Sequence, residues 1–436
     1  MNDTIFALSS GQPPAGIAVI RISGPDAGTA LAALAGQLPS PRRATLATLS
    51  DPRDGMHLDR TMVLWLPGPH TATGEDSTEL HLHGGRAVVM AVEQVLASLP
   101  GLRRAHPGEF TRRAFANGRI DLAEAEGLAD LLAAETELQR RSALAMAEGV
   151  LSRQAESWRN TLLALSARLE ASLDFSDEDD VGDGDAEGTT SMPSGFAAQC
   201  ATLALDLEEW LARPRAEPLR EGFRVVLAGP PNAGKSTLFN ALVEQEAAIT
   251  AAEPGTTRDV LVHAAALDGI PFTFVDTAGL REDGAGEIER IGIARARAAA
   301  ERADLILWLG PEGQGPQGRA LWEVSARTDD PAAPRKSHRA LHLSARTGDG
   351  VAALRSALVA HARSALPAPG QAALNQRQHD RLGEAARSLR VAAIENDPLL
   401  AAENLRLARR ALDGLIGRTG TEDMLDALFG RFCIGK

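Results

Sequence analysis

The sequence contains little cysteine and few aromatic residues. Only Cys200 and Cys433 occur among its 436 residues, tyrosine is absent, and aromatic side chains make up 4% of the chain. Two cysteines cannot form a disulfide framework, so we expect a reducing, cytoplasmic setting. The scarcity of aromatic rings leaves few platforms on which bases can stack. Contacts with a nucleic acid would therefore be shared with a partner.

Long apolar runs and an excess of positive charge are also missing. No stretch approaches the roughly 18 apolar residues that a membrane span needs, and residues 1–16 lack the basic and apolar regions of a signal peptide. We therefore expect no stable membrane association. The formal net charge of −13 opposes unaided binding to nucleic acid. One arginine-rich stretch is either a basic patch or an ordinary solvated face; it comprises Arg103, Arg104, Arg112, Arg113 and Arg119.

Apolar patterning divides the chain into blocks, in agreement with roughly one domain per 150 residues. Residues 1–118 alternate short apolar segments with Gly/Pro turns, which predicts a small mixed α/β domain. Residues 119–217 and 367–436 show helical periodicity, whereas residues 218–366 alternate short apolar strands with helices. We predict an α/β multidomain protein in which an all-α helical domain is interrupted by an inserted α/β domain with a parallel sheet.

The first helical block contains one regular apolar stripe and one break. The stripe has apolar residues three, four or seven apart; they are Leu151, Trp158, Leu162, Leu165, Leu169 and Leu173. The break is an acidic, Gly-rich stretch at 177–188. Its carboxylates do not meet the Asp-x-Asp-x-Asp-Gly spacing of a calcium loop, so we interpret it as a solvated loop.

A phosphate-binding motif is the strongest functional signal. The pattern Gly229-x4-Gly234-Lys235-Ser236 follows an apolar strand and opens a helix, which is the context that a P-loop requires. Its glycines let backbone N–H groups surround phosphate oxygens at the positive end of the helix dipole. We expect Lys235 to reach the β- and γ-phosphates and Ser236 to bind Mg2+. The expected nucleotide contacts in this segment are Asn232, Ala233, Gly234, Lys235, Ser236 and Thr237.

Further elements of a GTPase follow in the expected order. Thr257 in PGTTRD (254–259) can close over Mg2+ and the γ-phosphate as a switch. A strand ending in Asp276-Thr277-Ala278-Gly279 places Asp276 near the metal and the Gly279 amide on the γ-phosphate. Another strand leads into Ser344-Ala345-Arg346, as in the loop that backs the guanine. With the P-loop, these elements resemble a Ras-like GTPase domain and argue against a kinase or a metabolic P-loop enzyme.

The guanine-reading motif departs from the usual Asn-Lys-x-Asp pattern. Its place, between the strand at 303–309 and Ser344, is held by Ala326-Arg327-Thr328-Asp329. Asp329 can accept hydrogen bonds from the two donors on the guanine edge, and Arg327 can lie along the base as lysine usually does. The asparagine that ties this loop to the P-loop is missing. We therefore expect a weakened guanine preference, with Asp330 as a rival to Asp329.

The water-orienting glutamine of Ras-like enzymes is also replaced. Leu280 follows the Asp-Thr-Ala-Gly motif and cannot orient water. Asn232 resembles the asparagine of potassium-activated GTPases, in which K+ takes the place of an arginine finger. Glu289 is the candidate for the water-positioning carboxylate, and its alternative is a solvated helix carboxylate paired with Arg290 or Arg295. The candidate catalytic residues are therefore Lys235, Asn232 and Glu289.

Longer motifs extend the resemblance over nearly the whole chain. GPPNAGKST, PGTTRDV, VDTAGLRE, EIERIGI and SARTG, with a terminal FCIGK, resemble the MnmE (TrmE) family of tRNA-modification GTPases. The N-terminal segments VIRISGP, GPHTATGEDSTELHLHGG and RRAHPGEFTRRAFANGRIDLAEAEGLADLL match that family as well. Motifs of this length are far more specific than a P-loop.

The resemblance implies an activity and its partners. A K+-activated GTPase would act with an MnmG-like FAD protein, as a heterotetramer, on certain tRNAs. Together they would install an aminomethyl or carboxymethylaminomethyl group at C5 of the wobble uridine. The one-carbon unit would come from 5-formyl- or methylene-tetrahydrofolate bound near the N-terminal domain. That domain would also form a homodimer, and the two G domains would pair in a K+-dependent way during hydrolysis.

The resemblance also implies sites, residue by residue. Folate would be bound by Arg21, Glu79, Arg119 and Lys436. Arg119 stands where the family often has lysine, which keeps the charge but changes its geometry. K+ would be held by Asn232, Ala251, Glu253 and Thr256, and Mg2+ by Ser236 and Thr257. The remaining nucleotide contacts would be Ala251, Ala252, Glu253, Pro254, Gly255, Thr256, Thr257, Asp276, Thr277, Ala278, Gly279, Asp329, Ser344, Ala345 and Arg346.

Each of these assignments has an alternative. Arg21 and Glu79 could form a structural ion pair instead of a ligand site. His81 and His83 form a His-x-His pair, but two ligands without a third make a poor zinc site, so we assign none. At the level of the whole protein, the alternative functions are a ribosome-assembly GTPase and a signalling GTPase switch.

The C-terminal tail has two interpretations. Cys433 lies fourth from the end, as in a prenylated membrane anchor. However, Gly435 and Lys436 follow it, and no lysine-rich run precedes it. We instead expect the tail to bring Lys436 towards folate, with Cys433 as a packed residue or a thiol involved in the modification chemistry.

Overall fold

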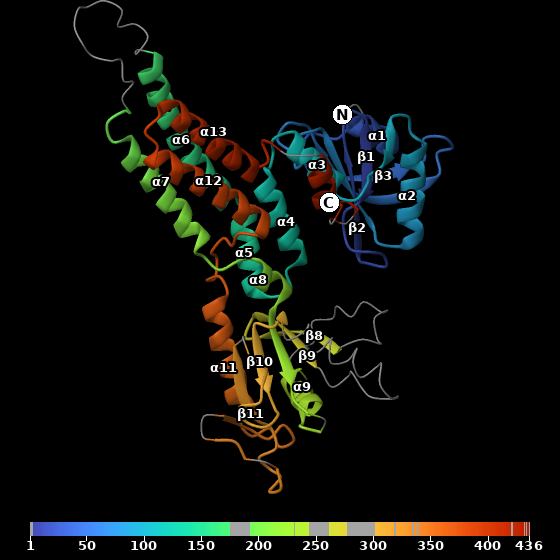
Figure 1. Cartoon of the computed structure of the whole chain (residues 1–436). Coiled ribbons are helices and arrows are strands. Elements are labelled where there is room, and N and C mark those ends of the chain that lie inside the picture. The colour runs from blue at the N-terminus through green and yellow to red at the C-terminus, as the bar shows by residue number, and fades with distance from the viewer. Residues whose placement is uncertain are drawn as a thin grey trace, which may run out of the picture. The chain divides into compact units, whose positions relative to one another are not determined.

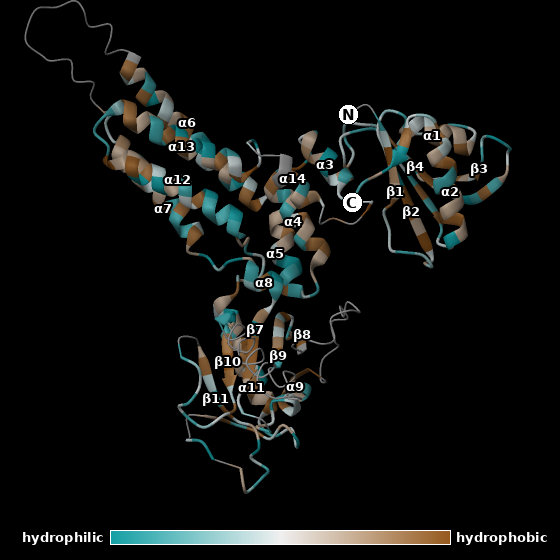
Figure 2. Cartoon of the chain, turned by 45° about the vertical axis from the view of Figure 1, so that its right-hand side comes forward, coloured by the Kyte–Doolittle hydropathy of each residue, from teal (hydrophilic) through white to brown (hydrophobic). Residues whose placement is uncertain are grey.

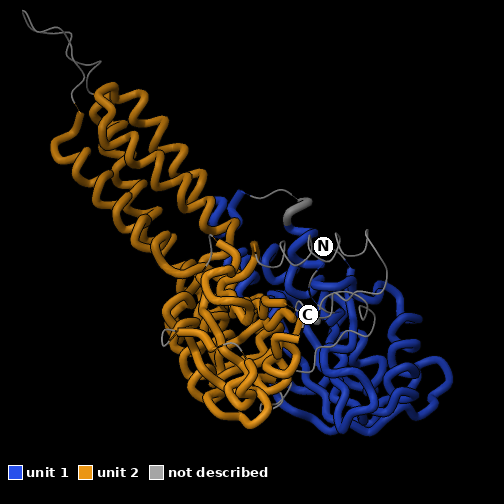
Figure 3. Tube along the Cα trace, turned by 60° about the horizontal axis from the view of Figure 1, so that its bottom comes forward, with its two compact units in different colours: residues 1–129, 413–436 blue, residues 130–412 orange. Residues whose placement is uncertain are grey.

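The structure, a computed structural model, describes residues 3–174, 192–230, 232–243, 261–276, 301–317, 320–333, 335–337, 340–419, 422–430, 432 and 434–435. The chain forms two compact units, residues 1–129 with 413–436 and residues 130–412 (Figures 1 and 3). Within the described residues, each unit contains one six-stranded sheet. The expected combination of mixed α/β and helical parts is confirmed. The domain boundaries at 118, 217 and 366 stay a prediction.

The sheet of the first unit has the strand order β3-β4-β5-β2-β1-β6. Its strands are β1 (Thr4–Leu8), β2 (Ile17–Ser23), β3 (Thr45–Ser50), β4 (His57–Leu66), β5 (Ser77–His83) and β6 (Leu102–Arg104). Neighbouring strands are antiparallel, except that β1 and β6 are parallel. Buried and less buried residues alternate along β2, β4 and β5, so the two faces of the sheet differ.

One face of this sheet is covered by helices α1 (Ala27–Ala35) and α2 (Arg86–Ser98). Beneath them, Ile20, Val63 and Leu80 are fully buried. The period of two in the strands and the helical spacing in α1 and α2 bring these apolar residues into one core.

The opposite face is only partly covered. Near β1, Phe110 of α3 (Glu109–Ala116) packs on Ile5 and Ala7. Farther across the sheet, Ile17 and Leu46 are 61% and 63% exposed. The side chains on this open face include Ile17, Val19, Arg21, Met62, Leu64, Glu79 and His81.

The C-terminal segment returns to the first unit. Helix α4 (Leu122–Ala133) begins there, and the Leu122 N–H donates to the Ile416 carbonyl oxygen. After α14 (Glu422–Phe429), Phe429 and Phe432 pack against Ala125 of α4. The end of the chain is thus fixed to the unit that contains its beginning.

The helices of the second unit include long amphipathic ones. They are α5 (Glu137–Ala147), α6 (Val150–Asp174), α7 (Phe196–Leu211), α12 (Gln376–Ile394) and α13 (Pro398–Leu415). The predicted apolar stripe of α6 is confirmed between Leu151 and Leu169. The side chains of the stripe in this range are buried. In its middle, Trp158 donates to Asp206 at 2.7 Å and meets Trp210 edge-on. The acidic stretch at 177–188 lies outside the described residues.

The sheet of the second unit has the order β12-β11-β10-β7-β9-β8. Its strands are β7 (Phe223–Ala228), β8 (Leu261–Leu267), β9 (Ile270–Asp276), β10 (Leu305–Trp308), β11 (Leu321–Ser325) and β12 (Leu341–His342). All neighbouring pairs are parallel except β8 with β9. Every residue of β9 is buried, and Figure 2 shows β7, β9 and β10 as a hydrophobic band. Burial on both faces is typical of a parallel sheet.

Helices α8 (Glu217–Glu221), α9 (Lys235–Val243) and α11 (Val351–Ala365) accompany this sheet. The chain enters and leaves the α/β part through adjacent segments, because the Ala216 N–H donates to the Leu374 carbonyl oxygen at 3.0 Å. This pairing agrees with an α/β domain inserted into a helical one.

Candidate functional site

The P-loop connects β7 to α9. Gly229 and Gly234 have φ values of +154° and +91°, and Asn232 has φ +62° in the left-handed region. These conformations turn the chain sharply before the first turn of α9. The N–H groups that begin a helix have no partner within it, so they can serve as donors to an anion. Asn232, Ala233, Gly234, Lys235, Ser236 and Thr237 all belong to this segment.

The Lys235 ammonium lies over this loop. Its Nζ donates to the carbonyl oxygens of Gly229 at 2.8 Å and Pro230 at 2.9 Å. Burial lowers the pKa of Lys235, and the negative charge of Asp276 partly opposes that shift. A cation that is nearly buried and held beside backbone donors provides strong electrostatic attraction for phosphate oxygens.

Ser236 and Asp276 converge from two neighbouring elements. Asp276 ends β9 and is fully buried, whereas Ser236 lies in the first turn of α9. The Ser236 hydroxyl donates to Asp276 Oδ2 at 2.8 Å. A hydroxyl and a carboxylate are the hard oxygen ligands that Mg2+ accepts. Ser236, with Asp276 beside it, therefore fits the part of the expected magnesium site that the structure describes.

Asp329 is joined to the loop that follows β12. The Ser344 hydroxyl donates to Asp329 Oδ1 at 2.7 Å, and Arg346 Nε donates to Oδ2 at 2.8 Å. The hydrogen bond from Ser344, followed by that from Arg346, lowers the pKa of Asp329 below its ordinary range. The Ala345 N–H donates to the Ala326 carbonyl oxygen at 3.2 Å. Asp329, Ser344, Ala345 and Arg346 thus lie together.

Asp330 and Arg327 take different positions. Asp330 accepts from Arg327 Nη2 at 2.5 Å, and Arg327 Nη1 donates to the Asn232 carbonyl oxygen at 3.3 Å. A Cβ on Gly234 would lie 3.6 Å from Arg327 Cγ, so the two loops are in contact. Arg327 therefore connects this loop to the P-loop, the connection that the missing asparagine usually makes.

Several expected contacts fall outside the described residues. They are Ala251, Ala252, Glu253, Pro254, Gly255, Thr256, Thr257, Thr277, Ala278, Gly279, Glu289, Cys433 and Lys436. The switch threonine, most of the expected K+ ligands and the water-positioning carboxylate therefore stay predictions.

In the first unit, Arg21 and Glu79 are partners in the register of β2 and β5. Arg21 Nη2 lies 3.0 Å from Glu79 Oε1. The Arg21 guanidinium carbon also lies 6.0 Å from the centre of the Phe110 ring, at the edge of the cation–π range. The two residues form an ion pair, as expected if their role is structural. They also lie on the open face of the sheet, where a ligand can reach them.

Arg119 contacts the loop between β4 and β5. Gly74 in this loop has φ +80°, and a Cβ there would lie 3.2 Å from Arg119 Cγ. Glycine therefore gives the Arg119 side chain room to lie across the loop. The loop is held to β2, because Thr73 Oγ1 lies 2.7 Å from Ser23 Oγ. Ser23 is two residues from Arg21, so it faces the same side of the sheet.

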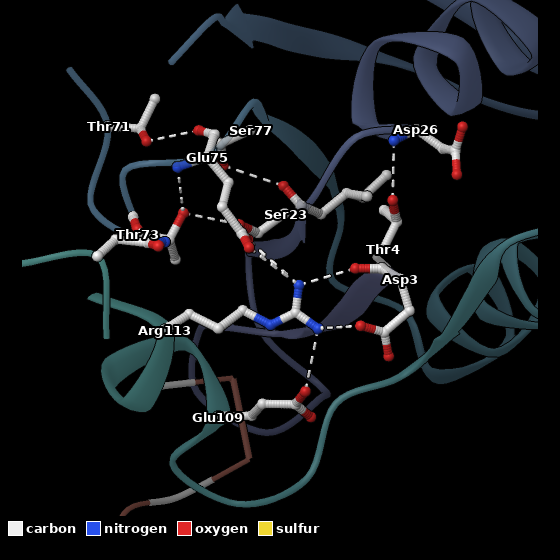
Figure 4. A network of polar contacts seen from close by, with 12 residues as sticks. Asp3, Thr4, Ser23, Asp26, Thr71, Thr73, Glu75, Ser77, Glu109 and Arg113 are labelled. Atoms are coloured by element: carbon white, nitrogen blue, oxygen red, sulfur yellow. Dashed lines mark hydrogen bonds and ion pairs between the residues drawn. The ribbon is translucent and has the colours of Figure 1, made fainter. Parts of the chain in front are cut away.

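A buried arginine organises this region (Figure 4). Arg113 is 1% exposed and donates to Asp3 Oδ1 at 2.9 Å, to Glu109 Oε1 at 3.1 Å and to Glu75 Oε2 at 3.2 Å. These carboxylates come from the residue before β1, from α3 and from the loop before β5. Glu75 also accepts from the Ser23 hydroxyl at 2.8 Å. One cation thus holds three chain segments around the end of the sheet.

The C-terminal tail reaches the same sheet. Gly435 has φ +93°, and a Cβ there would collide with the Leu8 carbonyl oxygen at the end of β1. Only glycine allows this approach. Leu8 follows Ala7, which is the register partner of Arg21. Gly435 therefore lies close to Ala7, the residue of β1 that pairs with Arg21.

The arginine-rich stretch is not a free basic patch. Arg103 pairs with Asp3 and Glu109, Arg104 with Glu93, and Arg112 with Asp426. Arg113 is buried, so the interpretation as a solvated face is wrong for this residue. The Glu109-x3-Arg113 spacing on a helix was a signal for this pairing, because residues four apart are neighbours on a helix.

His81 has a position that its His-x-His spacing did not predict. Its Nε2 lies 3.3 Å from Glu79 Oε2, beside the Arg21–Glu79 pair. Among the described residues, no group of three or more His, Cys, Asp or Glu side chains is arranged to hold a metal ion. Within the same residues, no helix is both long and apolar enough to span a membrane.

Comparison with known proteins places the whole chain in one family. Residues 4–119 match the family described as GTP-binding protein TrmE N-terminus, and residues 122–433 match the MnmE helical domain. The chain belongs to the MnmE family of tRNA modification GTPases. The tRNA modification GTPase MnmE of Novosphingobium aromaticivorans is 80% identical over 437 residues and covers 100% of both chains. That of Erythrobacter litoralis is 59% identical over 434 residues, again covering 100% of both.

The comparison with solved structures found a similarity over about a third of this MnmE family member. The crystal structure of the G domain of the T. maritima FeoB iron transporter has a TM-score of 0.24 and 22% identity. It covers 32% of this chain and 98% of that one. The family matches and the arrangement of the P-loop carry the assignment.

Proposed function

We propose that the chain is a K+-activated GTPase that modifies the wobble uridine of certain tRNAs together with an MnmG-like FAD protein. The observation that carries this proposal is the convergence of Lys235, Ser236 and Asp276 at the mouth of the P-loop. It supports nucleotide hydrolysis, and membership of the MnmE family supports tRNA as the object of the reaction.

In this proposal each described residue of the nucleotide site has one task. The N–H groups at the start of α9 and Lys235 bind the phosphates, and Asp329 accepts from the base edge. Ser236 would hold Mg2+ together with Thr257, which lies outside the described residues. When bound, Mg2+ offsets negative charge on the β- and γ-phosphates. Because Ser236 also donates to Asp276, its hydroxyl oxygen stays directed towards the mouth of the loop.

K+ would be held by Asn232 together with Ala251, Glu253 and Thr256. The left-handed conformation of Asn232 and the contact of its carbonyl oxygen with Arg327 fix its backbone at the edge of the P-loop. Glu289 would position the attacking water. These assignments follow the family resemblance, because four of the five residues lie outside the described part of the chain.

The second site would bind 5-formyl- or methylene-tetrahydrofolate on the open face of the first sheet. Arg21, Glu79 and Arg119 would supply charges there, and Lys436, which lies outside the described residues, would add a further basic group. A carboxylate and basic side chains suit folate, which combines an aminopyrimidine edge with a carboxylate tail.

The same face supports the proposed homodimer. Ile17, Leu46 and Met62 expose apolar surface beside the Arg21–Glu79 pair. Exposed apolar groups on one face of a sheet are typical of an interface. A second copy covering this face would also close the folate site.

Two measurements test the proposal. GTP turnover is compared in KCl and in NaCl at equal ionic strength; a faster rate in KCl is expected, and equal rates would remove the K+ mechanism. The wobble uridine of tRNA from cells lacking the protein is analysed by mass spectrometry. Loss of the C5 modification is expected, whereas unchanged modification would contradict the role in tRNA. Co-sedimentation with ribosomal particles would then favour the ribosome-assembly alternative.

A further inference from the structure

Glu79 is held by Arg21 at only one of its two oxygens. Arg21 Nε and Nη2 lie 3.3 and 3.0 Å from Oε1, and neither reaches Oε2. A fork in which each nitrogen meets a different oxygen would fix the carboxylate plane. Two bonds to one oxygen do not, because the terminal torsion of glutamate is broad. Arg21 alone therefore leaves the carboxylate free to rotate.

His81 supplies the second contact. Its Nε2 lies 3.3 Å from Glu79 Oε2, and because a carboxylate only accepts, the ring N–H is the donor. His81 is two residues from Glu79 on β5, so both side chains point to the open face. The His81 backbone is itself fixed, since Thr61 Oγ1 donates to its carbonyl oxygen and its register partners are Val19 and Met62.

We propose that His81 is a positioning residue of the tetrahydrofolate site, which holds the Glu79 carboxylate in one plane for the aminopyrimidinone edge of the reduced pterin. That edge presents a ring N–H beside an amino group, and two adjacent donors match the two oxygens of a carboxylate. Each carboxylate oxygen has two lone pairs, so the single bond from His81 leaves one free on Oε2 for the first donor of the pterin. The second donor would share Oε1 with Arg21, whose Nε makes the longer of its two bonds there, at 3.3 Å. This inference rests on the proposed folate site.

The energetic effect comes from preorganisation. Side chains that are ordered before binding lose less freedom when the ligand arrives, which tightens binding. Arg21, His81 and Glu79 have side chains 26%, 22% and 19% exposed, so solvent reaches them but does not surround them. A hydrogen bond to a carboxylate in such a setting is expected to change affinity by about five- to tenfold.

His83 on the same strand provides a matched control. Its Nδ1 lies 2.7 Å from Asp59 Oδ1, so it also pairs with a carboxylate. Its side chain is 73% exposed, and it does not contact Glu79. A substitution of His83 therefore removes similar chemistry from β5 without touching the proposed clamp.

The test measures binding of 5-formyltetrahydrofolate to the full chain by calorimetry. His81→Ala is expected to weaken binding about five- to tenfold, and His81→Gln, which keeps an amide donor near the same place, to stay within about twofold of the native chain. His83→Gln is expected to bind as the native chain does. Melting temperatures are recorded for each variant.

Some outcomes would overturn the inference. Native affinity in His81→Ala would show that the clamp has no role. Equal weakening in His81→Ala and His81→Gln, with lowered melting temperatures, would show that His81 only supports the fold. Absence of binding to the native chain would overturn the proposed folate site together with the inference, whereas the GTPase assignment would stand.

Discussion

The two sheets of this protein carry their candidate sites in different places. In the second unit the site lies at an edge, where the carboxyl ends of parallel strands meet. The P-loop follows β7, Asp276 ends β9, and Asp329 follows β11. The central strand β9 is buried on both faces, so the loops at the edge of the sheet are the parts available for chemistry.

In the first unit the site stands on a face. The antiparallel strands cover one side with apolar residues and leave charged side chains on the other. Arg21 and Glu79 come from distant parts of the chain and meet through strand register. Tight packing brings Gly435 to the end of β1 and Arg119 across Gly74. A site at an edge is thus built from contiguous motifs, whereas a site on a face depends on the whole fold.

The largest expected effect is on the stability of the ion-pair network around Arg113 in the first unit. Arg113→Met leaves Asp3, Glu75 and Glu109 without their shared cation, which should cost about 3–5 kcal/mol of local stability. The control Arg104→Ala removes one exposed pair with Glu93 and should cost less than about 1 kcal/mol. Hydrogen exchange of β1 and β5 amides measures both, because exchange reports local opening. Similar exchange in the two variants would contradict a special role for Arg113.

The next effect separates the two sites. Lys235→Ala removes the buried cation of the P-loop and should lower GTP turnover by roughly 10²- to 10³-fold. Amide exchange in the first sheet should not change, because Lys235 belongs to the other unit. Turnover close to that of the native chain would mean that the phosphate site lies elsewhere.

A smaller effect tests the guanine loop. Asp329→Asn replaces a carboxylate by an amide, and its new N–H₂ group faces a donor of guanine. Affinity for GTP should fall about 10- to 100-fold, with a relative gain for xanthosine triphosphate. Asp330→Asn should stay within about threefold, since Asp330 pairs with Arg327. Titration of fluorescent nucleotides measures both. If Asp330→Asn weakened binding more, the rival assignment would hold.

The smallest effect is a pH dependence of the first unit. Burial alone would raise the pKa of Glu109, but hydrogen bonds from Arg103 and Arg113 lower it below its ordinary 4.5. Asp3 also has a lowered pKa: burial opposes the shift, whereas Arg103 and Arg113 cause it. A lowered folded pKa stabilises the fold above the unfolded value, and this contribution is lost as pH falls through the folded value.

Acid should therefore loosen this region below about pH 4.5, and Glu109→Gln should show a weaker dependence on pH. Amide exchange of β1, corrected for its intrinsic pH dependence, measures the difference. An identical pH profile in the variant would show that Glu109 does not contribute to the loosening in acid.

Particular residues show how much of the structure could be predicted from the sequence. Helical spacing correctly predicted the buried side of α6, because a period in the sequence translates directly into a face of a helix. The pairing of Asp329 with Ser344 agrees with the predicted guanine loop, although its role stays a prediction. The role of Arg327 as a link to Asn232 could not be predicted, since it depends on how two loops meet.

The sequence by itself determined the family, the P-loop and the order of the GTPase elements, because each is written in a contiguous segment whose local conformation fixes its chemistry. Only the tertiary structure decided that Arg113 is a buried organiser, that Arg119 crosses Gly74, and that His81 completes the contacts of Glu79. These relations join residues far apart in the chain or depend on side-chain direction. Strand pairing and packing set them, and neither can be read from one segment alone.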